Sequence, residues 1–302
     1  MRIGTAPITW GVAGTPGWGM ELPYDRVLDE MGELGYAGTE LGPWGYLPTD
    51  PADLRRELEA RRLELIGAFC PLALHDAERG RVERAHGLRT AGLLRDLGAS
   101  TLVLAAAGDA ARERLAGRVP RDGSAGLDDA QWARFADAAN EIARAAADMG
   151  VATAFHPHVA TFVETPEEID RLLALTDPHL VGLCLDTGHV TYGGGDAAAI
   201  ARTHAARIRH VHAKDVRREV LERARADESD LPTAVSGGIF PPVGSGVVDF
   251  AAVIGALRDT GYEGWLVVEQ DVRLTNGALD RDPKSNARAS LACLRAMLDG
   301  GR

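Results

Sequence analysis

The feature that most constrains this chain is an alternation of short β-prone runs with stretches whose apolar residues recur at helical spacing. Such an alternation predicts parallel strands covered by helices. Eight βα units in 302 residues match a closed (β/α)₈ barrel of the α/β class. The eight runs are Ile3 to Trp10, Gly38 to Leu41, Leu63 to Phe69, Thr101 to Ala105, Val151 to His156, Leu180 to Asp186, Ile208 to Ala213 and Gly264 to Glu269.

The predicted helices between these runs carry start and stop residues. Thr165 precedes Pro166 and two glutamates, the pattern of an N-cap with proline in the first turn, and Gly150 and Gly261 stand where helices end. A doubly wound open sheet is the alternative, but no Gly-x-Gly-x-x-Gly follows the first run. The helices span Asp25 to Leu34, Asp53 to Arg62, Val82 to Leu97, Asp128 to Met149, Pro166 to Leu175, Ala197 to Ala206, Phe250 to Thr260 and Ser285 to Leu298.

Two stretches interrupt this rhythm, Gly108 to Leu127 and the Gly- and Pro-rich stretch from Arg223 to Gly246. We expect both to be long loops that follow strands, where barrels place residues that select a substrate. Residues 1–302 are therefore expected to form a single barrel domain.

Composition and charge exclude several classes of protein. With 33 basic and 44 acidic residues, the net charge of −11 repels nucleic-acid phosphates and anionic lipid. No signal sequence and no apolar run of about 20 residues is present, so a cytoplasmic location without membrane contact is expected. The cysteines Cys70, Cys184 and Cys293 form no Cys-x-x-Cys pair and are expected to be reduced core residues.

The last four runs end in ionisable residues, and a barrel would bring these ends to one mouth. Two imidazoles and two carboxylates there suit Mn²⁺, Co²⁺, Fe²⁺ or Zn²⁺, whereas an all-oxygen set is expected for Mg²⁺. The ionisable residues concerned are His156, His158, Asp186, His189, His210, His212, Lys214, Asp215, Glu269 and Asp271.

Each of these residues also has a purely structural interpretation. His212 shares a strand face with His210 and could be a core histidine, and Asp186 could cap the turn that follows it. Glu269 follows three apolar residues, where a carboxylate without a cation would be costly, so a functional role is favoured there. Cys184 is expected to serve packing. Histidines outside the pattern are expected to be surface or structural; they are His75, His86, His179 and His204.

These motifs together resemble the xylose-isomerase-like TIM barrels, which include sugar isomerases, epimerases, dehydratases and endonuclease IV. The similarity covers nearly the whole chain, and within the superfamily the sequence looks most like the inosose dehydratases of inositol catabolism. The motifs that carry it are Ala6-Pro7-Ile8-Thr9-Trp10, Gly38-Thr39-Glu40-Leu41-Gly42, Asp186-Thr187-Gly188-His189, Arg207-Ile208-Arg209-His210-Val211-His212-Ala213-Lys214-Asp215 and Gly264-Trp265-Leu266-Val267-Val268-Glu269-Gln270-Asp271.

The resemblance implies that a divalent ion is bound by His156, Asp186, His212 and Glu269. Mn²⁺ and Co²⁺ are expected first, with Fe²⁺, Zn²⁺ and Mg²⁺ as alternatives. Many epimerases and dehydratases of the superfamily have glutamate where this chain has His156. Because a metal-bound imidazole cannot act as the second base of a symmetric epimerase, a reaction on one face of the substrate is favoured.

The function implied is a metal-dependent lyase that dehydrates a keto-cyclitol such as 2-keto-myo-inositol through a metal-stabilised enediolate. Glu269 is the expected base, and the acid that protonates the departing hydroxyl is expected among His158, His189 and Lys214. The same three residues are also candidates for substrate binding. On the early-strand side, the residues expected to contact substrate are Glu40, Trp10, Trp44 and Tyr46, although barrel and loop packing would equally explain the aromatic ones.

Other functions stay open at this point. A ketose 3-epimerase or a sugar (phosphate) isomerase could use the same metal site. A repair endonuclease would need a basic groove, which the net charge opposes, and a sugar-binding barrel without activity would need no metal set. The expected partner is a small cyclitol or ketose rather than nucleic acid or a membrane. The sequence leaves open the exact substrate, the native metal and the oligomeric state, a homo-oligomer included.

Overall fold

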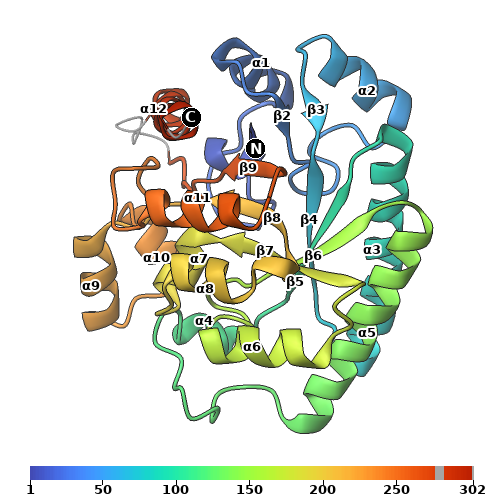
Figure 1. Ribbon diagram of the computed structural model, residues 1–302, viewed down its shortest axis with the longest axis vertical. Helices are drawn as coiled ribbons and strands as arrows, with labels where there is room; N and C mark the ends of the chain where they lie inside the picture. Colours follow the sequence, from blue (N-terminus) through green and yellow to red (C-terminus); the bar gives the residue numbers. More distant parts are fainter. Residues whose placement is uncertain (276–281, 301–302) are drawn as a thin grey trace.

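The computed structural model describes residues 1–275 and 282–300. In this part of the chain, nine parallel strands form one sheet in the order β3-β2-β1-β9-β8-β7-β6-β5-β4, with helices outside it (Figure 1). The strands are β1 (Arg2–Thr5), β2 (Gly38–Thr39), β3 (Glu64–Leu65), β4 (Gly67–Leu72), β5 (Thr101–Ala106), β6 (Ala152–His156), β7 (Val181–Asp186), β8 (Ile208–Ala213) and β9 (Trp265–Val268). The predicted barrel is confirmed.

The third predicted run divides into two strands, which accounts for nine strands instead of eight. β3 pairs with β2 and β4 pairs with β5, and only Ile66 separates them. Backbone hydrogen bonds continue past the division, because Ile66 N–H donates to Thr39 and Leu41 N–H donates to Gly67, both at 2.9 Å. One run thus joins both ends of the sheet and nearly closes the barrel.

The predicted helices are present with small shifts at their ends. They are α1 (Tyr24–Leu34), α2 (Pro51–Glu59), α3 (Ala77–Leu97), α5 (Asp129–Asp148), α6 (Pro166–Leu175), α8 (Ala197–Thr203), α11 (Phe250–Asp259) and α12 (Pro283–Asp299). The predicted start of α6 is confirmed, since Thr165 and Glu168 form a capping box. The first run ends earlier than predicted: β1 stops at Thr5, and a 3₁₀ helix, η1 (Pro7–Trp10), follows.

Four short helices lie in the segments that follow strands, where the sequence predicted none. They are α4 (Ala110–Arg114), α7 (Thr187–Tyr192), α9 (Arg218–Ala226) and α10 (Leu231–Ser236). The expected loop from Arg223 to Gly246 therefore includes the end of α9 and all of α10. Three of them, α7, α9 and α10, contribute apolar side chains to a second buried cluster, which includes Tyr192, Val220, Leu221 and Val235.

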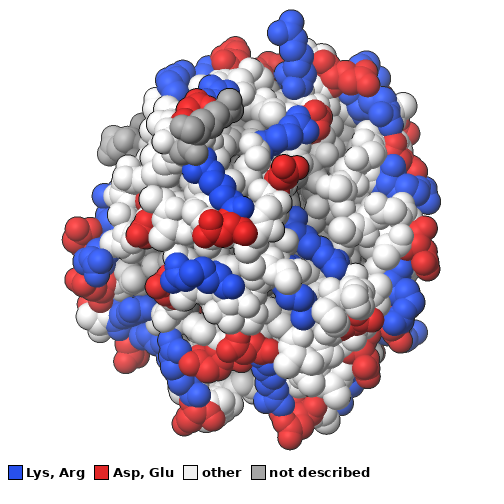
Figure 2. All heavy atoms as spheres, viewed as in Figure 1, with Lys and Arg blue, Asp and Glu red and all other residues white. Residues whose placement is uncertain are grey.

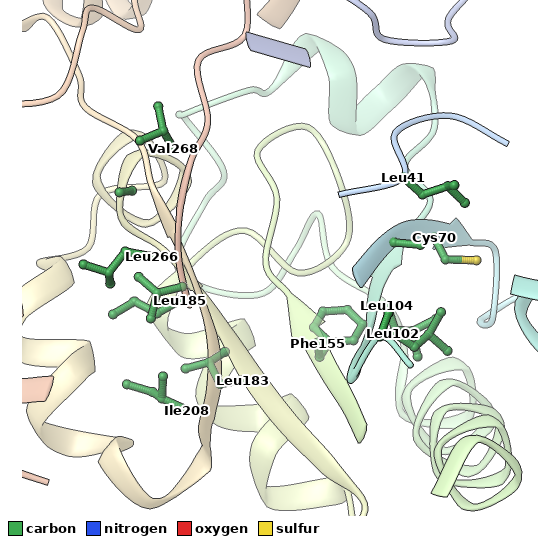
Figure 3. Packing of buried hydrophobic residues seen from close by; sticks show 14 of the residues in the cluster. Leu41, Cys70, Leu102, Leu104, Phe155, Leu183, Leu185, Ile208, Leu266 and Val268 are labelled. Atoms are coloured by element: carbon green, nitrogen blue, oxygen red, sulfur yellow. The ribbon is translucent and has the colours of Figure 1, made fainter. Parts of the chain in front are cut away.

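The main core lies between the sheet and its helices. Figure 3 shows part of it, with Leu102, Leu104 and Phe155 meeting near β5 and β6. All three cysteines are free; Cys70 and Cys184 are buried and Cys293 is half-buried. Within the described residues, none of the helices has the length and apolar character to cross a membrane. On the face drawn in Figure 2, acidic and basic side chains are interspersed.

Candidate metal and substrate site

The ends of β6, β7, β8 and β9 place four ionisable side chains at one end of the barrel. Asp186 pairs in register with His212, and His212 pairs with Val267, two residues before Glu269. His156 is the last residue of β6. Because adjacent parallel strands carry these residues at their carboxyl ends, the side chains meet in the barrel mouth.

The four residues expected to bind a metal form one compact, buried cluster. His156 Nε2 lies 3.2 Å from Asp186 Oδ2, and His212 Nδ1 lies 3.6 Å from the same oxygen and 3.2 Å from Glu269 Oε2. One donor atom from each of the four residues lies within 4.8 Å of the others. Two nitrogens and two oxygens this close are a donor set typical of borderline divalent ions.

Glu40 orients the imidazole of His212 for this role. His212 Nε2 lies 2.9 Å from Glu40 Oε1, so this nitrogen donates its proton to the carboxylate. The other nitrogen, Nδ1, is buried without a hydrogen-bond partner and faces Asp186 and Glu269. A carboxylate that holds the far nitrogen of a histidine is the usual support of a metal ligand. The residues present therefore fit a divalent ion.

Asp186 has both of the roles that the sequence left open. Its Oδ1 accepts a hydrogen bond of 2.7 Å from the backbone N–H of His189 and so caps α7. Its Oδ2 faces His156 and His212. The cap fixes the carboxylate and leaves one oxygen free to bind a cation.

Lys214 lies at the centre of the ionisable residues. Its Nζ is 2.8 Å from Glu269 Oε2, 2.9 Å from Asp271 Oδ1 and 3.3 Å from Asp186 Oδ2. Burial alone would lower the pKa of Lys214, but the three carboxylates raise it well above its usual value. The side chain therefore remains an ammonium ion in a buried position.

His158 and His189 stack on each other, with ring centroids 3.8 Å apart. His158 Nδ1 lies 2.6 Å from the carbonyl oxygen of Val159 and donates to it, and His189 Nε2 lies 2.9 Å from Lys214 Nζ and accepts from it. Burial, with the charges of His156 and Lys214, lowers the pKa of His158 to about 3. Burial also lowers the pKa of His189 well below its usual value, so both rings are neutral at neutral pH.

Asp271 joins this group, although no role was expected for it beyond its place after a strand. Burial raises the pKa of Asp271 to about 6, against the opposing charge of Lys214. One ligand atom from each of His158, His189 and Asp271 lies within 4.8 Å of the others, and Lys214 Nζ lies 2.9 Å from both His189 and Asp271. The ammonium group of Lys214 therefore already supplies the positive charge at this second cluster.

A cavity of about 660 Å³ opens next to the metal cluster. Of the residues expected to contact substrate, Glu40, Trp44, His158 and Lys214 line it. Glu40 is 1% exposed and bonded to His210 and His212, so its main contacts are with histidines. Trp44 is 40% exposed, which leaves its indole accessible to a ligand.

Two of the expected aromatic residues lie elsewhere. Trp10 is fully buried and its Nε1 donates to Glu30 at 2.8 Å, so it does not line the cavity. Tyr46 lines a separate depression, and its hydroxyl donates to the carbonyl of Leu22. The packing of the early segments decides these positions, which the resemblance of the motifs did not resolve.

The sequence also missed residues that reach the cavity. His86 on α3 lines it and meets Trp44 edge-on at 5.5 Å, although it was expected to be surface or structural. Phe69 on β4 lies beside His156, with ring centroids 5.4 Å apart. A histidine in the middle of a helix has no distinguishing pattern, so only the packing of α3 over the barrel mouth could reveal His86.

Comparison with known proteins decides the family. The family model described as xylose isomerase-like TIM barrel matches residues 17–297. The chain belongs to this family. It is 38% identical over 275 residues to an inosose dehydratase of Geobacillus kaustophilus (strain HTA426), covering 89% of this chain and 87% of that protein. It is 40% identical over 272 residues to the rhizopine catabolism protein MocC of Rhizobium meliloti, covering 90% and 82%.

Solved structures of the xylose isomerase-like fold agree. The IolI protein with a bound zinc atom superposes with a TM-score of 0.72 at 16% identity, covering 99% of both chains. An L-ribulose 3-epimerase gives a TM-score of 0.70 at 20% identity, covering 99% of this chain and 95% of that one. At these identities the superpositions establish the fold, and the predicted family and its dehydratase relatives rest on the sequence matches.

Proposed function

We propose that this protein is a metal-dependent carbon–oxygen lyase that removes water from a keto-cyclitol such as 2-keto-myo-inositol. The observation that carries the proposal is the pairing of Glu269 with Lys214, 2.8 Å apart at the edge of the four-residue metal cluster. The pair offers one carboxylate and one ammonium group at the same cavity. The names of the inosose dehydratase relatives support this choice of substrate class.

The metal ligands of the proposal are His156, Asp186, His212 and Glu269, with Mn²⁺ or Co²⁺ as the first candidates. The zinc atom of the IolI structure and the donor set both support a divalent ion. When bound, such an ion would act as a Lewis acid toward a carbonyl oxygen and its neighbouring hydroxyl.

Glu269 is the base in this proposal. Burial raises the pKa of its carboxyl, but the positive charges of protonated His212 and of Lys214 outweigh burial and hold that pKa at about 2. When His212 binds the ion through Nδ1 it gives up that proton, and the positive charge of the ion would take its place beside Glu269. The side chain is therefore ionised at neutral pH and can accept the proton next to the substrate carbonyl.

Lys214 is the acid in this proposal. Of the three candidates, His158 and His189 are neutral, with lowered pKa values, whereas Lys214 carries three protons on Nζ. Lys214 lines the cavity and could protonate the departing hydroxyl, with Asp271 holding the ammonium in place at 2.9 Å. His158, which lines the cavity, then serves to bind substrate, and His189, which does not line it, serves to orient Lys214.

We expect purified, metal-loaded protein to contain a single divalent ion bound by the four ligands. Metal analysis and anomalous scattering measure this. Asp186→Asn is expected to lose the ion because it removes the anionic oxygen at the centre of the cluster. His204→Asn, which changes a histidine paired with Asp170 away from the cluster, should retain it. A fully occupied ion elsewhere, with the four side chains bonded only to protein, would contradict the ligand assignment.

The reaction itself is tested by mass and by solvent deuterium. Metal-loaded protein should convert a keto-inositol to a product that has lost water. Because His156 stands where an epimerase would hold a second carboxylate, deuterium from D₂O should enter without inversion, or elimination should outrun exchange. Rapid inversion of a ketose, with no loss of water from any keto-cyclitol, would replace the dehydratase by the epimerase that the sequence left open.

A further inference from the structure

Glu164 is a buried carboxylate outside the cluster just described. It precedes the N-cap of α6, and its side chain is 1% exposed. Oε1 accepts a hydrogen bond of 2.8 Å from the backbone N–H of Gly117, and Oε2 accepts one of 2.7 Å from the backbone N–H of Ala160. These two donors belong to different segments, residues 107–128 after β5 and residues 157–164 after β6.

Both segments form part of the cavity wall. The first contributes Gly108 and Glu113, and the second contributes His158 and Ala160, among others. Ala160 has a φ of +70°, a strained value for a residue other than glycine, so contacts around it must hold it there. Its carbonyl oxygen packs directly against Gly108, where a Cβ would come within 2.1 Å of that oxygen.

A second connection runs parallel to that of Glu164. Buried Arg112 forms a bidentate ion pair with Glu168 at 2.8 and 3.0 Å, and Glu168 also accepts the backbone N–H of Glu164 at 2.9 Å. Two charged groups thus face Glu164, the positive Arg112 and the negative Glu168. On the side of α7, the Tyr192 ring packs against Gly117, near Arg118 and Arg225.

We propose that Glu164 is a positioning residue, whose carboxyl group holds residues 107–128 and 157–164 together and so fixes the cavity wall that carries His158. The side chain suits this place because it offers two oxygens, and each of them accepts one of the two backbone N–H groups. No other side chain accepts from these two N–H groups in the described part of the chain. The inference rests on the proposed function only where activity is measured.

The test is amide hydrogen exchange, without substrate, in peptides that contain Gly117 and Ala160. Glu164→Ala leaves two buried donors without an acceptor, so exchange in both peptides should quicken by about tenfold or more, the effect expected from one lost hydrogen bond to a charged group. Peptides within the strands β5, β6, β7 and β8 themselves serve as the internal reference and should not change. Asp170→Asn, an exposed carboxylate on the same helix, is the matched control and should exchange like the wild type.

If Glu164→Ala fails to fold, the pH dependence of the wild type decides the matter. Burial raises the pKa of Glu164 to about 7, above its usual 4.5. A carboxyl that reaches water when the segments separate binds its proton less tightly, so separation becomes easier as the pH rises from 4.5 through 7. After correction for intrinsic rates, both peptides should lose protection between about pH 4.5 and pH 7, and Glu164→Gln should abolish that change.

Two results would overturn the proposal. The first is a folded Glu164→Ala variant in which both peptides exchange at the wild-type rate. The second is an equal acceleration of amide exchange throughout the barrel, which would indicate a merely structural role. In kinetics with a keto-cyclitol, KM should rise more than kcat falls. If the wild type acts on no keto-cyclitol, the proposed function fails, whereas the exchange result still decides the role of Glu164.

Discussion

Replacing Glu269 with glutamine is expected to lower kcat by about 10²-fold or more while the protein stays folded. Glutamine keeps the shape of the side chain but removes the negative charge and the ability to accept a proton. In the structure Glu269 Oε2 contacts both His212 and Lys214, so the substitution changes the chemistry of these two contacts.

The measurement is kcat at saturating substrate, with metal content determined on the same sample. Because Glu269 also belongs to the metal cluster, the variant must be compared at equal metal occupancy. Glu263→Gln is the matched control, since Glu263 is exposed just before β9 and makes the same chemical change at the opposite end of the strand. Near-normal turnover in a metal-replete Glu269→Gln would remove this residue from the mechanism.

Replacing Lys214 with methionine is expected to lower kcat by about 10² to 10⁴-fold, the range of a lost general acid. Methionine keeps much of the volume but carries no proton to donate. If protonation of the departing hydroxyl is what is lost, a substrate analogue with fluorine at that position should be affected less, because fluoride leaves without an acid. Steady-state kinetics with both substrates measure this difference.

The chain offers an unusually clean control for this experiment, because Lys214 and Lys284 are its only lysines. Lys284→Met removes a lysine that pairs with Glu33 at the surface and should leave kcat unchanged. Lys214→Arg keeps the positive charge among the carboxylates, but a guanidinium is a weaker acid than an ammonium group, so this variant should fold and lose most of its activity. Equal losses with both substrates would assign Lys214 to holding Glu269 and Asp271 in place instead.

The barrel was predictable because its pattern is local. The runs that became β7 and β8 show their apolar residues and their polar ends within six positions, and the structure places those strands within one residue of the prediction. Helices with caps, such as α6, were equally readable, since a capping box depends on four adjacent residues. The division at Ile66 was not, because it depends on which neighbour each half of the run pairs with.

The early half of the site was less predictable than the late half. Trp10 and Tyr46 were expected to contact substrate on the early-strand side, yet their hydrogen bonds go to Glu30 and Leu22. His86 reaches the cavity from a helix in which nothing marks it. Aromatic and helical positions have no fixed relation to the barrel mouth, so packing between distant segments places them.

By itself, the sequence determined the barrel and the set of residues that its late strands carry to one mouth. That much follows from topology, since parallel strands in a closed sheet must bring their carboxyl ends together. Only the tertiary structure decided which partner each of these side chains contacts. The proton of His212 points to Glu40, 172 residues away in sequence, and Glu164 joins Gly117 to Ala160. Hydrogen bonds act over about 3 Å, and no local pattern fixes which remote atoms come that close.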